Sequence, residues 1–148
     1  MKNKLKNAYY LLLPIILGGL VGFIINKYID YPILNKPPLA PPKSIFPIMW
    51  SIIYILMGIS YYLYRKKTDE KNNLYYIQLF VNLLWSIIFF VFKFRLLSIL
   101  WIVLLDILVY LLIIKFKNVN KISAYLNIPY LLWCIFATYL TIGIYVLN

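Results

Sequence analysis

Histidine is absent from this chain of 148 residues, and cysteine occurs once, as Cys134. Without histidine the chain has neither an imidazole general base nor the commonest metal ligand, so no metal site is expected. A single cysteine has no partner for an intramolecular disulfide. Because Cys134 lies within an apolar run, we interpret it as a packing residue rather than a nucleophile.

Acidic residues are also scarce, with four Asp and Glu against 15 Lys and Arg. Asp69 and Glu70 stand beside lysines in a polar stretch, where a solvated surface is the simplest interpretation. The sequence has no glycine-rich phosphate loop, no paired carboxylates inside apolar runs and no paired cysteines. Hydrolytic and metal-dependent chemistry is therefore not expected, and no cofactor is assigned.

Apolar residues dominate what is present. They make up 64% of the chain, only 13% is charged, and the mean hydropathy is +0.84. A soluble domain of this size has too little interior to bury so much apolar surface. The apolar residues form five continuous runs, each close to the ~20 residues with which a helix crosses a bilayer; a β-barrel would alternate. We therefore predict an all-α integral membrane protein, a single domain of five transmembrane helices over residues 8–26, 44–64, 74–92, 96–116 and 122–147.

Basic residues flank the predicted spans instead of forming one patch. Ten lie before the first span and after the second and fourth, whereas the opposite side has five: Lys27, Lys36, Lys43, Lys93 and Arg95. The positive-inside rule then places the N-terminus in the cytoplasm and the C-terminus outside. Attraction to anionic headgroups explains the net charge of +11 more simply than a nucleic acid does, so the lipid bilayer is the expected partner.

Prolines concentrate between the first two spans, at Pro37, Pro38, Pro41 and Pro42. Each proline fixes its φ angle, removes an amide donor and favours extended geometry in the residue before it. The segment is therefore semi-rigid and loses little entropy when it is ordered. Irregular backbone in a membrane protein is tolerated at the surface or over an internal cavity. We call residues 27–43 the lid loop.

Polar, aromatic and small residues recur at helical spacing on one face of several spans. Asparagine and glutamine side chains are costly on a helix face that contacts lipid, so these faces are expected to turn inward. Close helix packing explains Gly18 and Gly22 more readily than a ligand does, and it explains aromatic stripes as well as a cavity would. Besides Gly18 and Gly22, the residues on these inward faces are Asn26 in the first span; Trp50, Tyr54, Gly58 and Tyr61 in the second; Gln78, Asn82, Trp85, Ser86, Phe89 and Lys93 in the third; and Pro129, Trp133, Ala137 and Thr141 in the fifth.

Asp106 lies near the middle of the fourth span. A charged carboxylate at that depth costs ~2.5–3.5 kcal/mol even on lenient insertion scales. No basic residue occupies the middle of another span, so we expect Asp106 to be protonated or hydrogen-bonded to Asn82, Trp85 or a tyrosine hydroxyl. We favour a structural contact over a proton relay.

Four blocks of sequence, in order, carry a family resemblance. They are residues 34–38 with Pro41-Pro42, 46–54 and Met57-Gly58; Gln78-Leu79 with Asn82, Trp85 and Phe89-Phe90; Asp106 among leucines; and residues 129–140. This pattern resembles the TspO/MBR family, also called translocator proteins or tryptophan-rich sensory proteins. The resemblance covers nearly the whole chain.

The resemblance implies a bundle of five helices, usually a homodimer, with a cavity closed by the lid loop. Family members bind porphyrins, notably protoporphyrin IX, which here would be a ligand or substrate rather than a cofactor. Trp50 and Trp133 match the tryptophans with which bacterial members degrade protoporphyrin in light. Carried over by position, the ligand-binding residues would be Tyr31, Pro41, Ile45, Trp50, Asn82, Ser86, Phe89, Trp133 and Ala137, with polar support from Asp106 and Trp85.

The chain departs from the family pattern in its lid loop, where Pro38 and Leu39 replace the usual Ser-Trp pair. The lid is therefore expected to be stiffer and to lack one aromatic ring. Thr141 stands where family members usually have asparagine. No basic residue follows Tyr139 or Tyr145, as the proposed cholesterol motif requires, so no specific sterol site is expected.

Three functions remain open at this point. We favour a porphyrin-binding membrane receptor or sensor, in which light-dependent degradation of the porphyrin is an uncertain enzymatic activity. The alternative is a transporter of tetrapyrroles or other amphipathic molecules, although the chain shows no inverted repeat. A structural membrane subunit with a packed interior is the third. Abundant lysine, isoleucine and asparagine indicate an AT-rich bacterial genome, and hence a bacterial plasma membrane.

Overall fold

The computed structural model describes residues 2–148, and in that part of the chain it is all-helical, without strands. Five segments are long and apolar enough to cross a membrane: Asn3–Tyr28, Ile45–Lys67, Asn73–Val91, Arg95–Lys117 and Lys121–Leu147. The predicted class, an all-α protein with five spans, is confirmed. The elements are α1 (Lys2–Ile25), η1 (Asn26–Tyr28), η2 (Tyr31–Ile33), α2 (Ile45–Lys67), α3 (Asn73–Ser86), η3 (Ile87–Val91), α4 (Arg95–Lys117), α5 (Lys121–Tyr125) and α6 (Ile128–Leu147).

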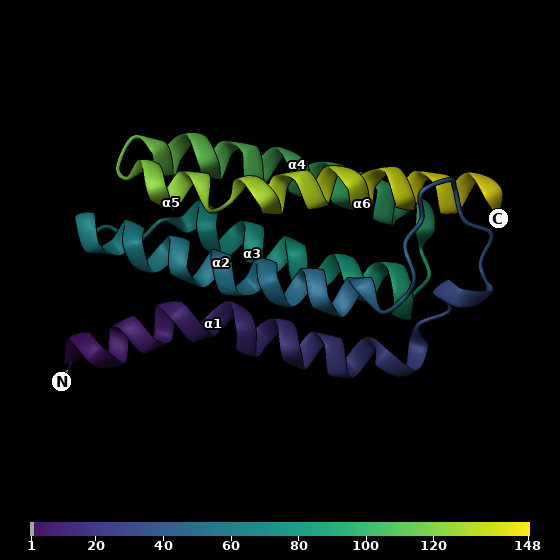
Figure 1. Ribbon diagram of the computed structural model, residues 1–148, viewed down its shortest axis with the longest axis horizontal. Coiled ribbons are helices and arrows are strands. Elements are labelled where there is room, and N and C mark those ends of the chain that lie inside the picture. Colours follow the sequence, from purple (N-terminus) through teal and green to yellow (C-terminus); the bar gives the residue numbers. More distant parts are fainter. Residues whose placement is uncertain (1) are drawn as a thin grey trace.

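The five spans run side by side along the long axis of the molecule (Figure 1). The two ends of the chain lie at opposite ends of the bundle, as an odd number of spans requires. The lid loop lies at the same end as the C-terminus, and we call this the lid end. α1 lies along one side of the bundle next to α2, whereas α4 and α6 pack together on the opposite side.

The helix ends differ little from the predicted spans, except that α1 begins at Lys2 rather than at residue 8. The fifth span is broken between α5 and α6, where Pro129 occupies the first turn of α6. Proline suits that position because the missing amide would have no helical partner there. The third span ends in a π-helical turn, η3, in which the Phe92 amide donates to the Ile87 carbonyl oxygen at 3.1 Å. A turn of this kind holds one more residue than an α-helical turn and rotates the side chains that follow.

The apolar core lies between α2, α3, α4 and α6, and α4 contributes the most regular part of it. Five α4 side chains at helical spacing are fully buried: Ile102, Leu105, Val109, Leu112 and Phe116. α1 is peripheral, since only 17% of its most apolar window is buried, compared with 44% for the third span. α1 therefore lies at the edge of the bundle and packs mainly on α2.

Two glycines bring α1 and α2 together over part of their length. A Cβ at Gly58 would collide with the Leu11 carbonyl oxygen, and a Cβ at Gly18 would collide with the Tyr54 ring. A Cβ at Gly19 or Gly22 would meet nothing within 4 Å. The two helices are therefore in close contact as far as Gly18, and they leave open space between Gly18 and the lid end.

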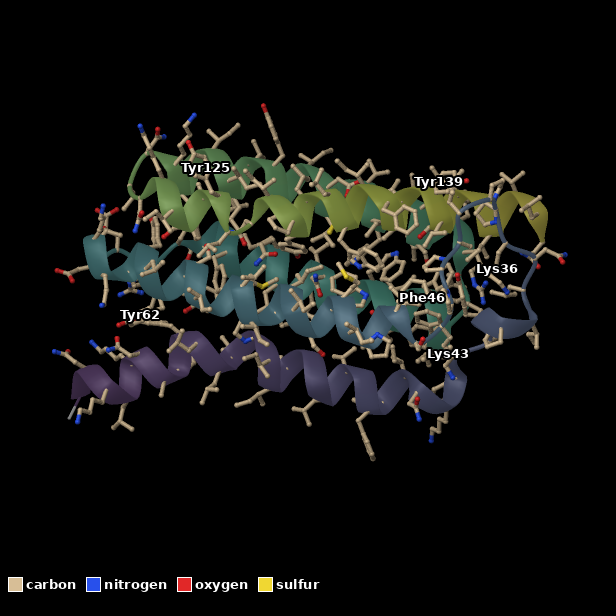
Figure 2. All side chains as sticks on the ribbon, in the orientation of Figure 1. Lys36, Lys43, Phe46, Tyr62, Tyr125 and Tyr139 are labelled. Carbon is tan, nitrogen blue, oxygen red and sulfur yellow. The ribbon has the colours of Figure 1, made fainter. Side chains whose placement is uncertain are left out.

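The lid loop is attached to α6. The Tyr139 hydroxyl donates to the Pro38 carbonyl oxygen at 2.6 Å, and the Asn148 side-chain amide donates to the Asn35 carbonyl oxygen at 2.8 Å. Pro37 packs on Gly143, where a Cβ would stand 2.5 Å from the proline ring. Figure 2 shows Tyr139 on α6 beside the part of the loop that carries Lys36. The stiff segment expected from the prolines is thus held in place by hydrogen bonds and by close packing.

Charged and polar groups also hold the first half of the loop. Asp30 accepts a hydrogen bond from Arg95 at 2.7 Å and forms an ion pair with Lys93 at 3.2 Å. Lys36 donates to the Tyr31 and Leu34 carbonyl oxygens, both at 3.0 Å. These contacts tie the loop to itself and to the connection between η3 and α4.

Candidate functional site: a cavity between α1, α2 and α3

A cavity of about 460 Å³ lies between α1, α2 and the third span, below the lid loop. This volume falls within the ~300–1,000 Å³ typical of sites for small organic ligands. The cavity exists because α1 separates from α2 beyond Gly18. Its lining residues are Ile15, Gly18, Gly19, Val21, Gly22, Ile25, Asn26, Ile29, Tyr31, Lys43, Phe46, Pro47, Trp50, Ser51, Tyr54, Ile55, Trp85, Ser86 and Phe90.

Aromatic rings form much of the cavity wall. Trp50 and Tyr54 are one helical turn apart on α2 and stack with their ring centroids 5.8 Å apart and an interplanar angle of 26°. Trp85 and Phe90 contribute from the third span, with their rings 6.2 Å apart and nearly perpendicular. Aromatic faces of this kind bind flat, apolar ligands by offset stacking and by burying their surface.

A buried hydrogen-bond network stands behind the aromatic wall. The Tyr54 hydroxyl donates to the Asn82 side-chain oxygen at 2.6 Å, and the Asn82 amide donates to the Tyr130 hydroxyl at 2.8 Å. Tyr130 in turn donates to the Gln78 side-chain oxygen at 2.7 Å. The network connects α2, α3 and α6 and fixes the Tyr54 ring. Because Asn82 is buried behind Tyr54 and does not line the cavity, its role is to position Tyr54 rather than to meet a ligand.

The structure brings several of the predicted site residues together. Tyr31, Trp50 and Ser86 line the cavity, and so does Trp85, which was expected only as polar support. Phe89 and Ala137 lie instead around a void of about 20 Å³ next to it. Four aromatic residues border both spaces and separate them: Tyr31, Phe46, Trp85 and Phe90.

The remaining predicted residues lie close to the cavity without lining it. Trp133 is 9% exposed and contacts Trp50 edge-on, with ring centroids 6.4 Å apart and an interplanar angle of 87°. Pro41 accepts a hydrogen bond from the Tyr31 hydroxyl through its carbonyl oxygen at 2.6 Å. Ile45 is half-buried and packs against the core at the start of α2.

Asp106 belongs to a different part of the bundle. The Thr138 hydroxyl oxygen lies 2.6 Å from an Asp106 carboxyl oxygen and 2.8 Å from the Cys134 carbonyl oxygen, and its single hydrogen can be donated to either of them. The contact connects α4 to α6 and does not reach the cavity. The structure thus contains the expected polar contact, but the partner is Thr138 rather than Asn82, Trp85 or a tyrosine.

The lining residues that the sequence did not predict include Lys43, just before α2, and Pro47, Ser51 and Ile55 on α2. They are one helical turn apart but share no chemical character, so nothing in the sequence marks them as a face. Phe90 was also missed. It follows the lining residue Ser86 by four residues, the spacing that places two residues on one helix face. It borders both the cavity and the small void, whereas Phe89 borders the void alone.

The cavity has its charged group at the lid end. Within residues 2–148, Lys43 is the one charged side chain among the lining residues, and Figure 2 shows it at the start of α2 beside Phe46. Partial burial raises the pKa of the Tyr31 hydroxyl above its ordinary value. Tyr31 therefore remains protonated and keeps its hydrogen bond to Pro41. The site offers an aromatic, apolar body with a cation at one end.

Comparison with known proteins places the chain in a family. The TspO/MBR family pattern matches residues 10–147. The chain is 38% identical to the tryptophan-rich protein TspO of Chlorobaculum tepidum over 124 residues, or 80% of this chain and 78% of that protein. It is 33% identical to the tryptophan-rich protein TspO of Archaeoglobus fulgidus over 99% of both chains. It is also 31% identical to translocator protein 2 of the dog, over 81% of this chain and 73% of that protein. This multi-pass membrane protein therefore belongs to the TspO/MBR family.

Proposed function

We propose that the protein is a membrane receptor or sensor that binds porphyrins, protoporphyrin IX in particular, in the cavity between α1, α2 and α3. The observation that carries the proposal is the stacked pair Trp50 and Tyr54 on the wall of a 460 Å³ space. A porphyrin is flat and apolar over most of its surface, which suits offset stacking on these rings. Its carboxylate side chains suit the cationic end of the cavity, where Lys43 lies.

Quenching of tryptophan fluorescence by protoporphyrin IX tests the proposal. Trp50 and Trp85 line the cavity, whereas the Trp101 indole donates to the Val81 carbonyl oxygen at 2.7 Å and is not among the lining residues. We expect saturable quenching at micromolar ligand in nanodiscs. Trp50→Phe and Trp85→Phe should each remove part of the quenched signal, and the matched control Trp101→Phe should leave it. Quenching that never saturates, or none at all, would favour a structural subunit with a packed interior.

We further propose that bound porphyrin is slowly degraded in light, with dioxygen as the oxidant and Trp50 as the indole nearest to the ligand. Support comes from the position of Trp50 on the cavity wall and of Trp133 directly behind it. Loss of porphyrin absorbance under illumination measures the activity. Trp50→Phe should remove most of the rate, Trp133→Phe a smaller part and Trp101→Phe none. An unchanged rate in the Trp50→Phe/Trp133→Phe double variant would exclude the tryptophan mechanism.

We also propose a bacterial plasma membrane location with a cytoplasmic N-terminus, and a homodimer as the working state. The basic residues predicted to lie on the cytoplasmic side and the bacterial relatives support the location. Reporter fusions at each terminus, active on one side of the membrane only, test the orientation. Chemical crosslinking in native membranes tests the dimer. A C-terminal reporter that is active in the cytoplasm would reverse the orientation.

A further inference from the structure

The exposed lining residues of the cavity form two facing stripes. One stripe consists of Ile15, Gly19 and Gly22 on α1 and Asn26 at the start of η1. The other consists of Lys43, which precedes α2, and Pro47, Ser51 and Ile55 on α2. All eight residues are exposed. The lining residues of the third span, Trp85, Ser86 and Phe90, are buried or half-buried. The cavity is therefore open along the seam between α1 and α2 and closed towards the third span.

This seam lies within the membrane-spanning part of the bundle. Gly19 and Gly22 belong to the span Asn3–Tyr28, and Ser51 and Ile55 belong to the span Ile45–Lys67. Because a Cβ at either glycine would meet nothing within 4 Å, no side chain of the described residues fills the gap. Lipid acyl chains therefore lie outside this opening, and a molecule dissolved in the bilayer meets the cavity without crossing water.

Passage through the lid loop is the alternative route. An entry that required the lid loop to open would have to break the contacts of Tyr139 with Pro38 and of Asn148 with Asn35, and to lift Pro37 off Gly143. The two hydrogen bonds and the packing contact would have to break together. The loop is also stiff, so opening one end of it displaces the rest. The seam needs no such rearrangement.

We infer that the ligand enters the cavity sideways from the bilayer, between α1 and α2 at Gly19 and Gly22, while the lid loop stays attached to α6. The inference rests on the proposed function and narrows the class of ligand. It selects molecules that partition into the bilayer with an apolar body in the hydrocarbon and an anionic end at the interface. Lys43 and Asn26, at the lid end of the seam, meet that anionic end.

Rates of protoporphyrin IX binding in nanodiscs test the entry route. Gly19→Leu/Gly22→Leu fills the seam, and we expect association and dissociation each to slow about tenfold. Such a paired change marks a blocked route, because mere loss of binding contacts would speed dissociation. Leu20→Phe is the matched control, since it adds bulk to an exposed position on α1 outside the cavity lining and should change neither rate.

A lid variant separates the two routes. Tyr139→Phe/Asn148→Ala removes hydrogen bonds that hold the loop, and we expect unchanged association. Faster association in this variant, together with an unaltered rate in the seam variant, would overturn the inference and make the lid the gate. Ser51→Leu narrows the seam from the α2 side and replaces the glycine variant if that one fails to fold. Absence of saturable binding by the wild-type protein would overturn the proposed function itself, which is a distinguishable result.

Discussion

At the level of single residues, the lid loop contains a backbone conformation that its sequence does not favour. Leu39 has a φ of 71°, in the left-handed region, and its side chain is 85% exposed. For a residue with a Cβ this conformation costs roughly 1–2 kcal/mol. The prolines around Leu39 and the contacts of the loop with α6 hold it there, so this strain lies in the part of the loop that departs from the family pattern.

Replacing Leu39 by asparagine should stabilise the protein. Asparagine adopts the left-handed region more readily than leucine, and the exposed leucine side chain loses little packing. We expect Leu39→Asn to raise the free energy of unfolding by about 0.5–1 kcal/mol, measured as a higher melting temperature in detergent. Ile33→Asn is the matched control, because Ile33 is also 85% exposed but has a negative φ. Equal shifts in both variants would show that Leu39 stores no strain.

Lys43 is expected to recognise a carboxylate on the ligand. An exposed ion pair contributes about 0.2–1 kcal/mol. Lys43→Ala should therefore weaken binding of protoporphyrin IX up to about fivefold and leave binding of its dimethyl ester unchanged. Titrations of tryptophan fluorescence compare the two ligands. Lys27→Ala, which removes an exposed lysine near the same end, should affect neither. A parallel loss for acid and ester would show that Lys43 acts through packing alone.

At the level of elements, the packing of α1 on α2 decides where the cavity begins. Gly58 permits the close approach, since its missing Cβ leaves room for the Leu11 carbonyl oxygen. The two residues of the Gly18-x-x-x-Gly22 pattern then differ in role. Gly18 packs against the Tyr54 ring, as the packing interpretation predicts, whereas Gly22 faces open space at the seam.

Gly58→Ala should push α1 away from α2. The added Cβ meets backbone, which cannot rotate out of the way, so we expect a loss of about 1–3 kcal/mol in unfolding free energy. Gly22→Ala makes the same chemical change where nothing lies within 4 Å, and it should be neutral or stabilising. Thermal unfolding in one detergent compares the two. A Gly58→Ala protein as stable as the wild type would mean that the helices do not need this contact.

In the third span, α-helical spacing predicts which side chains face inward but not which of them line the cavity. Gln78, Asn82 and Trp85 face inward as the α-helical spacing predicts. After Ser86 the helix widens into the π-helical turn, in which Phe90 borders both the cavity and the small void and Phe89 borders the void alone.

At the level of the whole molecule, Asp30 connects segments that are far apart in the sequence. It joins the lid loop to the start of α4 through Arg95 and Lys93. Asp30 and Arg95 are 18% and 14% exposed in their side chains, so water weakens their pairing less than it would at a fully exposed site. The cavity, its lid and the connection between the third and fourth spans are thus held as one unit at the lid end.

Asp30→Ala should loosen this end of the molecule. We expect a loss of about 1 kcal/mol in unfolding free energy at low salt, and less at high salt, where the ion pair is screened. Asp69→Ala is the matched control, because within residues 2–148 the Asp69 carboxylate forms no ion pair. Melting temperatures at two salt concentrations measure the effect. A loss that is the same at both concentrations would exclude an electrostatic cause.

The five spans can be predicted from the amino-acid sequence alone, because a chain in hydrocarbon must satisfy its backbone hydrogen bonds within each helix, and runs of ~20 apolar residues do so. It also located the stiff lid loop and several cavity residues, among them Tyr31, Trp50 and Ser86. The place where the cavity opens could not be predicted from the sequence. It depends on the separation of α1 from α2 beyond Gly18, which arises from contacts between distant residues. Periodicity indicates which face of a helix turns inward, but not which neighbour approaches it or how closely.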